Sequence, residues 1–118
     1  MGNSTDQDRV FASVAELFSV LSTPIRLKII SAVCHGVKNV TELLAEIDTT
    51  QPNMSQHLET LYRCGVLAKR HDGVQMHYSP QSERVAELCR AVCSQVAMKL
   101  DPAAQVEASE RLVAAGIR

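Results

Sequence analysis

The stretch TTQPNMSQHLETLYRCGVL, from Thr49 to Leu67, decides the fold because it has the pattern of an amphipathic helix with a start and a stop. Thr50 is a suitable N-cap, and Pro52 is tolerated in the first turn, where its missing N–H needs no partner. Gly65 is the residue type expected just past a helix C-terminus. Apolar residues recur at helical spacing and predict a face that packs into a core; they are Met54, Leu58 and Leu61.

The other face of this predicted helix is polar near its N-terminal end. Its side chains are short or planar hydrogen-bonding groups, namely Gln51, Asn53, Ser55, Gln56 and His57. Such groups pair with base edges and phosphates when a helix enters the major groove of DNA. We therefore expect this face to contact DNA.

The residues before this stretch predict three more helices. Apolar periodicity indicates a helix over about Asp6–Leu21, and Thr23-Pro24 opens a second helix that ends near Gly36. Thr41 is expected to cap a short third helix, TELLAEI, which the Thr49–Leu67 helix follows after a few residues. Two short helices joined this tightly form a helix-turn-helix.

The residues after this stretch predict a β-hairpin. Two short extended runs, Val66–Arg70 and Gln75–Tyr78, flank a segment that contains Asp72-Gly73, a pair typical of tight hairpin turns. A helix-turn-helix followed at once by a hairpin is a winged helix, so the fold is expected to be mainly α with a β-hairpin wing. The wing adds three residues to the expected DNA contacts, namely Arg70, His71 and Gln75.

A long fifth helix is predicted from about Ser82 to Leu100, and Asp101-Pro102 separates it from a last amphipathic segment ending at Gly116. The first and fifth helices carry more apolar surface than a small DNA-binding core absorbs, which favours a two-fold dimer. We expect a single domain over 1–118, with segments of about 1–21 and 82–115 forming the dimer interface. Such a dimer would set two recognition helices about one DNA turn apart.

Composition is compatible with a cytoplasmic protein. A chain of 118 residues, 46% of them hydrophobic, can form one core without disulfide or metal staples. No run approaches the roughly 18 apolar residues that span a bilayer, and MGNSTDQDR lacks the features of a secretory signal, so no membrane partner is expected. The net charge of −1 is unusual for a DNA-binding domain, although Arg63, Lys69 and Arg70 outnumber Asp72 around the wing.

Cys89 and Cys93 are candidate sensor residues, because a spacing of four places them on neighbouring turns of one helix face. Two such thiolates can hold a soft ion such as As(III), Cd, Zn or Cu(I), or undergo reversible sulfur oxidation. The alternative is structural, since cysteine is often buried and Cys89 lies within the apolar stripe of the helix. Cys34 is expected to lie in the core.

An enzyme is not predicted. The cysteine pair is C-x-x-x-C within a helix, and not the C-x-x-C near a strand that a thiol oxidoreductase uses. The sequence also shows no set of nucleophile, base and orienting residue, and no phosphate-cradling glycine loop.

The chain resembles the ArsR/SmtB family of bacterial winged-helix repressors over about Val14–Leu100. The resemblance rests on LSTPIRLKII (Leu21–Ile30), NMSQHLETLYRCGVL (Asn53–Leu67) and KRHDGVQMHYS (Lys69–Ser79). It implies a homodimer, formed through the first and fifth helices, that occupies an operator and leaves it when an inducer binds. It also implies phosphate contacts from wing residues such as Arg70, and DNA contacts from Ser55, Gln56 and His57.

The positions of the family's inducer sites differ in this chain. A cysteine pair in the pattern E-L-C-x-C is absent from Glu42–Glu46, which reads ELLAE. The paired carboxylate and histidine ligands of another site type lack their histidines, since the fifth helix offers only Glu83, Glu87, Cys89 and Cys93. In a third type, Cys64 matches one cysteine position and Thr60 stands at the other.

The sequence therefore predicts a dimeric repressor of double-stranded operator DNA that senses an inducer through Cys89 and Cys93, with Cys64 as a further candidate. The inducer would be a soft metal, a metalloid, or a reactive sulfur or redox species. Two alternatives stay open: a DNA-binding regulator with purely structural cysteines, and a winged-helix module that binds another protein. Arg26, near the start of the second helix, is expected either to contact a phosphate or to form a salt bridge.

Overall fold

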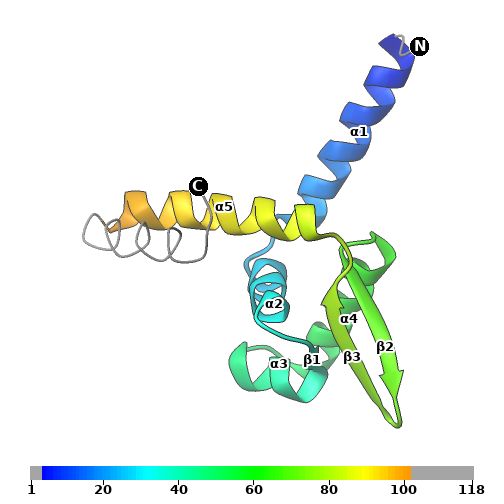
Figure 1. Ribbon diagram of the computed structural model, residues 1–118, viewed down its shortest axis with the longest axis vertical. Coiled ribbons are helices and arrows are strands. Elements are labelled where there is room, and N and C mark those ends of the chain that lie inside the picture. Colours follow the sequence, from blue (N-terminus) through cyan, green and yellow to red (C-terminus); the bar gives the residue numbers. More distant parts are fainter. Residues whose placement is uncertain (1–3, 102–118) are drawn as a thin grey trace. The chain divides into compact units, whose positions relative to one another are not determined.

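The computed structural model describes residues 4–101, which form five helices and three strands (Figure 1). The chain consists of two compact units, Met1–Glu83 and Arg84–Arg118. The predicted mainly helical fold with a β wing is confirmed, and the amphipathic segment expected after Asp101 lies outside the described residues. In chain order, the elements are α1 (Ser4–Leu21), α2 (Pro24–Cys34), β1 (Lys38–Asn39), α3 (Val40–Glu46), α4 (Gln51–Arg63), β2 (Leu67–Asp72), β3 (Gln75–Pro80) and α5 (Glu83–Leu100).

Helices α2 and α4 begin as the sequence predicts. The Thr23 hydroxyl oxygen accepts a hydrogen bond from the Arg26 N–H at 3.2 Å, and the Thr50 hydroxyl oxygen accepts one from the Asn53 N–H at 3.3 Å. Each helix has a proline in its first turn, where the lost N–H costs nothing. After α4, Gly65 adopts a φ of +76°, a conformation that ends the helix and is easy only for glycine.

Helix α3 begins differently from the prediction, because its N-cap is Asn39 and Thr41 lies inside the helix. The Asn39 side-chain oxygen accepts from the Glu42 N–H at 2.8 Å, and the Glu42 carboxylate accepts from the Asn39 N–H at 3.0 Å. This reciprocal capping box satisfies two N–H groups that Thr41 could not reach together. The sequence does carry this pattern, as an asparagine three residues before a glutamate.

The wing is the hairpin of β2 and β3, and β1 adds a third strand that was not predicted from the sequence. The antiparallel order is β1-β3-β2, and Lys38 pairs with Tyr78. The turn differs by one position from the predicted Asp-Gly turn, because Asp72 pairs with Gln75 and leaves Gly73 and Val74 as the two-residue loop. Gly73 has a φ of +65°, whereas no non-glycine residue among those described has a positive φ. Glycine first and an ordinary residue second is the pattern of a type II′ hairpin turn.

A core beneath the helix-turn-helix and the hairpin holds the first unit together. The face of α4 predicted to pack inward does so, and α4 contacts α2, α3 and β2. Burial of a large aliphatic side chain stabilises a fold by about 1.5–3 kcal/mol, so this small core is enough to fix α4 in place. The buried side chains are Leu21, Ile29, Ile30, Val33, Leu43, Ile47, Met54, Leu58, Leu61, Val66, Leu67 and Tyr78.

Helices α1 and α5 leave most of their apolar side chains exposed. On α1, Phe11 is 72% exposed and Phe18 is 52% exposed, whereas Leu21 is buried. On α5, Val92 is 53% exposed. None of the helices within residues 4–101 is by itself long and apolar enough to span a bilayer; α1 and α2 pass such a test only together, across an 89° bend.

Candidate nucleic-acid interface and cysteine sites

The N-terminal half of α4 presents a polar surface on a rigid support. The side chains of Met54, Leu58 and Leu61 are 0% exposed and anchor one face of the helix. Four of the five predicted DNA-contacting residues of α4 lie on its exposed surface, namely Gln51, Asn53, Ser55 and Gln56. A helix fixed from below in this way can hold its outer side chains in the geometry that base recognition requires.

His57, the fifth of these residues, lies at the boundary between the exposed and buried faces. Its Nδ1 atom accepts a hydrogen bond of 3.0 Å from Nε of Arg26 in α2. Arg26 also donates from Nη1 to the backbone oxygen of Val20 in α1, at 2.9 Å. Arg26, for which we expected a phosphate contact or a salt bridge, therefore makes hydrogen bonds inside the protein. Burial, and secondly the charge of Arg26, lower the pKa of His57 below its usual 6.5.

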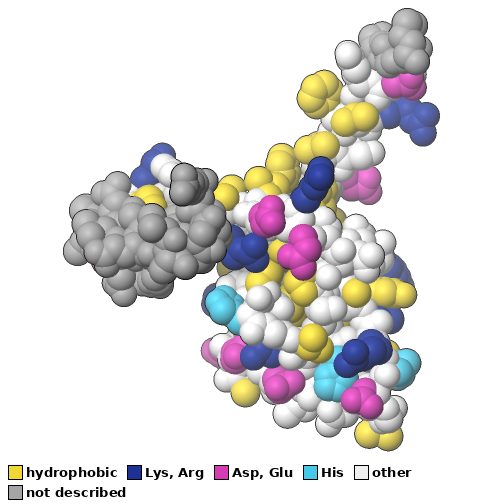
Figure 2. Space-filling model, viewed as in Figure 1, with side chains coloured by type: hydrophobic (Ala, Val, Ile, Leu, Met, Phe, Trp, Pro, Cys, Tyr) yellow, Lys and Arg dark blue, Asp and Glu magenta, His cyan; other side chains and the backbone are white. Residues whose placement is uncertain are grey.

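The wing carries the other predicted DNA contacts. Arg70, His71 and Gln75 are all exposed, and Arg70 and His71 lie on β2. The Gln75 Oε1 atom accepts a hydrogen bond of 3.0 Å from Asn39 Nδ2, which ties the wing to the N-terminus of α3. At the hairpin end of the first unit, basic, acidic and histidine side chains are intermixed (Figure 2).

Two cations near the wing share one carboxylate. Glu59 of α4 forms ion pairs with Arg63 at 3.1 Å and with Lys69 at 3.5 Å. The Lys69 ammonium also lies 4.1 Å from the centre of the Tyr62 ring. Because Lys69 belongs to β2, these contacts hold the wing against α4, and they leave Arg70 as the wing cation with no ion pair among the described residues. The i,i+4 spacing of Glu59 and Arg63 could have revealed half of this cluster from the sequence.

The cysteines occupy four different environments. Cys89 is buried, which agrees with its expected place inside the apolar stripe of α5, and Cys93 is exposed. Cys64 is exposed at the C-cap of α4, and Cys34 is only partly buried. Within residues 4–101, no three His, Cys, Asp or Glu side chains lie close enough together to hold a metal ion.

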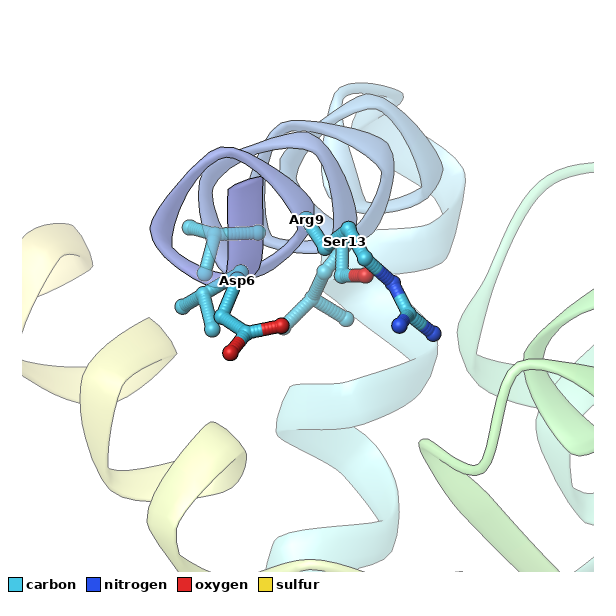
Figure 3. A pocket seen from close by; sticks show the side chains of 6 residues that line it. Asp6, Arg9 and Ser13 are labelled. Carbon is cyan, nitrogen blue, oxygen red and sulfur yellow. The ribbon is translucent and has the colours of Figure 1, made fainter. Parts of the chain in front are cut away.

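One side of α1 forms the wall of an open hollow. Asp6, Arg9 and Ser13 lie along this side (Figure 3), and the remaining lining residues are Val10, Val14 and Leu17. All six belong to α1, so the hollow is one face of this helix, with polar residues along one side and apolar residues along the other. Exposed apolar residues gathered beside polar ones are typical of a surface that packs against another protein surface.

A helix-turn-helix with an exposed polar helix and an adjoining β-hairpin defines the class of winged helix-turn-helix transcriptional regulators. Residues 23–69 match the family model described as bacterial regulatory protein, arsR family. The chain belongs to this family, because it is also 34% identical to a helix-turn-helix transcriptional regulator over 74% of that protein's length.

Three similar proteins illustrate the relationship. A probable mercury resistance operon repressor of Streptomyces lividans is 34% identical over 76 residues, covering 64% of this chain and 61% of that repressor, so less than two thirds of its length is matched. The HTH-type transcriptional regulator Rv0081 of Mycobacterium tuberculosis is 34% identical over 84 residues, 70% of this chain and 74% of that protein. The biofilm growth-associated repressor of Xylella fastidiosa is 31% identical over 87 residues, 74% of this chain and 76% of that protein.

Solved structures share the fold. The crystal structure of M. tuberculosis Rv0081 gives a TM-score of 0.70 at 34% identity and covers 77% of this chain and 92% of that one. The repressor BigR from Xylella fastidiosa gives 0.67 at 30% identity, covering 77% and 93%. A homodimeric winged helix-turn-helix domain from Mycobacterium bovis gives 0.75 at 23% identity, covering 84% and 92%, a likeness that concerns the fold alone.

Proposed function

We propose that the chain is a homodimeric transcriptional repressor that binds operator DNA and is released when an inducer acts on its cysteine thiols. The observation that supports DNA binding is the exposed polar surface of α4, which a buried apolar face holds rigid. The wing beside it carries the exposed Arg70. The repressor names of the relatives in Streptomyces lividans and Xylella fastidiosa support the same function.

The proposed DNA contacts divide into base recognition and phosphate contacts. The amides of Gln51, Asn53 and Gln56 can pair bidentately with adenine in the major groove, and Ser55 can pair with either a base or a phosphate. Arg70 and His71 on the wing would contact phosphates, which fix position but carry no sequence information. Gln75 would contact DNA through its amide N–H₂ group, since its Oε1 atom already accepts a hydrogen bond from Asn39.

The proposed dimer rests on the exposed apolar faces of α1 and α5. Phe11 and Phe18 on α1, and Val92 on α5, are each more than half exposed, although such residues are normally buried. Figure 2 shows hydrophobic side chains running along α1. A second copy of the chain is the economical partner, because a two-fold dimer buries the same faces on both copies and presents two recognition helices to a palindromic operator.

The proposed sensor is the pair Cys89 and Cys93. Their i,i+4 spacing on α5 brings the thiols to adjacent turns, and a two-fold axis near α5 would add the second copy's pair. A soft ion would displace the two thiol protons and bind the thiolates. Alternatively, an oxidant such as a polysulfide would take two electrons from the pair as it becomes a disulfide and releases two protons. Since Cys89 is buried, either event would disturb the packing of α5.

Titrating the protein into labelled DNA from the promoter region of its own gene tests the proposed binding to operator DNA. At moderate salt, we expect affinity at least about 1,000-fold higher than for shuffled DNA of equal composition, as for specific repressors. Equal affinity for both DNAs would contradict the proposal.

The sensing function needs a separate experiment on the reduced protein–operator complex. We expect Cd(II), As(III) or a polysulfide to release the wild type, and Cys93→Ser to abolish release by at least one of them. Cys34→Ser is the matched control, since Cys34 lies on α2 and belongs to neither candidate site; it should respond as the wild type does. A Cys93→Ser protein that responds normally to all three agents would exclude the Cys89–Cys93 sensor.

A further inference from the structure

The hydrogen bond between Arg26 and His57 determines which nitrogen of the histidine ring carries the proton. An arginine guanidinium is always charged in proteins and can only donate hydrogen bonds. Because Arg26 Nε lies 3.0 Å from His57 Nδ1, that nitrogen must act as the acceptor and is unprotonated. In a neutral imidazole the proton then lies on Nε2, which becomes a donor.

Arg26 is itself held in place. Its Nη1 atom donates to the Val20 backbone oxygen at 2.9 Å, so the guanidinium is fixed between the end of α1 and the side of α4. A donor fixed from two sides orients the imidazole as well as selecting its tautomer, as second-layer hydrogen bonds do for other functional histidines.

The Nε2 atom of His57 is accessible from outside the protein. Among the described residues, none forms a hydrogen bond with this atom. Every buried side-chain nitrogen or oxygen in that part of the chain does have a partner, so Nε2 is not buried. His57 follows Ser55 and Gln56 directly on α4, both of which are exposed. Its free N–H therefore opens to solvent at the margin of the surface proposed to meet DNA.

We propose that Arg26 is a positioning residue that fixes His57 in the Nε2–H tautomer, so that α4 presents one oriented hydrogen-bond donor to an acceptor atom of the DNA. This inference rests on the proposed DNA-binding function. The acceptors available are the guanine N7 and O6 atoms, adenine N7 and thymine O4 in the major groove, or a phosphate oxygen. The lowered pKa of His57 supports the assignment, because it keeps the ring neutral near pH 7.

Nuclear magnetic resonance of the free protein tests the tautomer without DNA. Long-range ¹H–¹⁵N correlation of the histidine rings at about pH 7.5 should show His57 in the Nε2–H form alone. Arg26→Met, which retains much of the apolar stem and removes the donor, should shift the His57 signals toward an average of both tautomers. A His57 ring protonated on Nδ1 in the wild type, or signals unchanged in Arg26→Met, would overturn the assignment.

A pair of neutral amide variants tests the donor on DNA. Glutamine can place its amide near the position of Nε2, whereas asparagine reaches only as far as Nδ1. We expect His57→Asn to weaken operator binding by about 5- to 100-fold, the value of one specific base contact, and His57→Gln to bind several-fold better than His57→Asn. Arg26→Met should weaken operator binding by about 2- to 10-fold, the value of one hydrogen bond. Equal binding by the asparagine and glutamine variants would overturn the proposal.

Base substitutions across the operator distinguish the two kinds of acceptor. If His57 contacts a base, His57→Asn loses the preference at one position of each half-site; if it contacts a phosphate, binding weakens uniformly over all sequences. The two hypotheses can fail separately. Wild-type protein that binds no DNA refutes the repressor function and the donor role together, whatever the tautomer, whereas normal operator binding with equal amide variants refutes only the role of His57.

Discussion

Asn39 and Gln75 are joined side chain to side chain, with Asn39 Nδ2 donating to Gln75 Oε1 at 3.0 Å. The same asparagine caps α3 through its side-chain oxygen. One residue thus caps a helix of the helix-turn-helix and bonds to the wing beside its turn, where Gln75 pairs with Asp72.

Substitutions of Asn39 should separate these two roles. Asn39→Ala removes both and should lower the free energy of unfolding by about 1 kcal/mol, the usual cost of losing an N-cap. Asn39→Asp retains the capping oxygen and loses the amide donor, so its stability should stay within a few tenths of a kcal/mol of wild type, roughly the spread among good caps. Urea unfolding measures both changes. Equal destabilisation by the two substitutions would show that the bond to Gln75, and not the cap, stabilises the fold.

Gln56→Ala should weaken operator binding by about 1–3 kcal/mol, because an amide that pairs with a base edge is lost. Binding to shuffled DNA should hardly change, since phosphate contacts supply that affinity. Gln81→Ala, the same change at an exposed position after β3, is a matched control that should bind as the wild type does. Fluorescence anisotropy against both DNAs decides the matter; a parallel loss on both would place Gln56 at a phosphate.

Arg70→Gln should reduce the dependence of binding on salt. Each phosphate contact releases condensed counterions, so the slope of log K against log salt should fall by about 1 per protomer. Arg63→Gln is the control, because Arg63 is already paired with Glu59 and should alter the slope less. Titrations at several salt concentrations give both slopes, and an equal change in the two variants would contradict the special role of Arg70.

Phe11→Glu should convert the proposed dimer into monomers, since it places a charge in the middle of the exposed apolar face of α1. The folded monomer should survive, because Phe11 is 72% exposed and contributes little to the core. Val74→Glu, at the fully exposed tip of the wing, is the control and should stay dimeric. Light scattering after gel filtration reports the masses. A wild type that is already monomeric would rule out the dimer.

Stability should fall as the pH falls below about 6.5, in part because of His57. Burial and the charge of Arg26 lower its pKa in the folded chain. The unfolded chain then binds a proton that the folded chain does not, so the favourable contribution is complete above 6.5 and is lost as the pH passes through the folded pKa. His57→Gln should reduce this fall, because it removes the titrating ring. Urea midpoints of both proteins at about pH 7.5 and 5.0 make the comparison, and parallel losses would show that His57 is not the cause.

The elements with strong local patterns could be predicted from the sequence. Thr50, Pro52 and Gly65 mark the limits of α4, and its apolar spacing identifies the buried face. The predicted start of α3 was wrong because two capping candidates, Asn39 and Thr41, lie two residues apart and only the capping box distinguishes them. Strand β1 was missed because a two-residue strand has no periodicity of its own and exists only through its pairing with β3.

The candidate site was predictable in its exposed part and not in its internal contacts. The polar face of α4 follows from helical spacing, whereas the bond between Arg26 and His57 joins residues 31 positions apart. Likewise, Glu59 meets Lys69 only because the wing folds back against α4. Such contacts depend on tertiary packing, and they change the interpretation of Arg26, His57 and Lys69.

The pairing of Glu59 with both Arg63 and Lys69 has a consequence for how the protein would search a genome. Affinity for arbitrary DNA comes almost entirely from unpaired cations next to phosphates. With one carboxylate offsetting part of the charge of these two cations, this end of the wing would hold unrelated sequences less tightly than two unpaired cations would. Weaker binding to unrelated DNA leaves more of the protein free to reach its target, since the ratio of specific to non-specific affinity decides how much of a regulator the genome holds elsewhere.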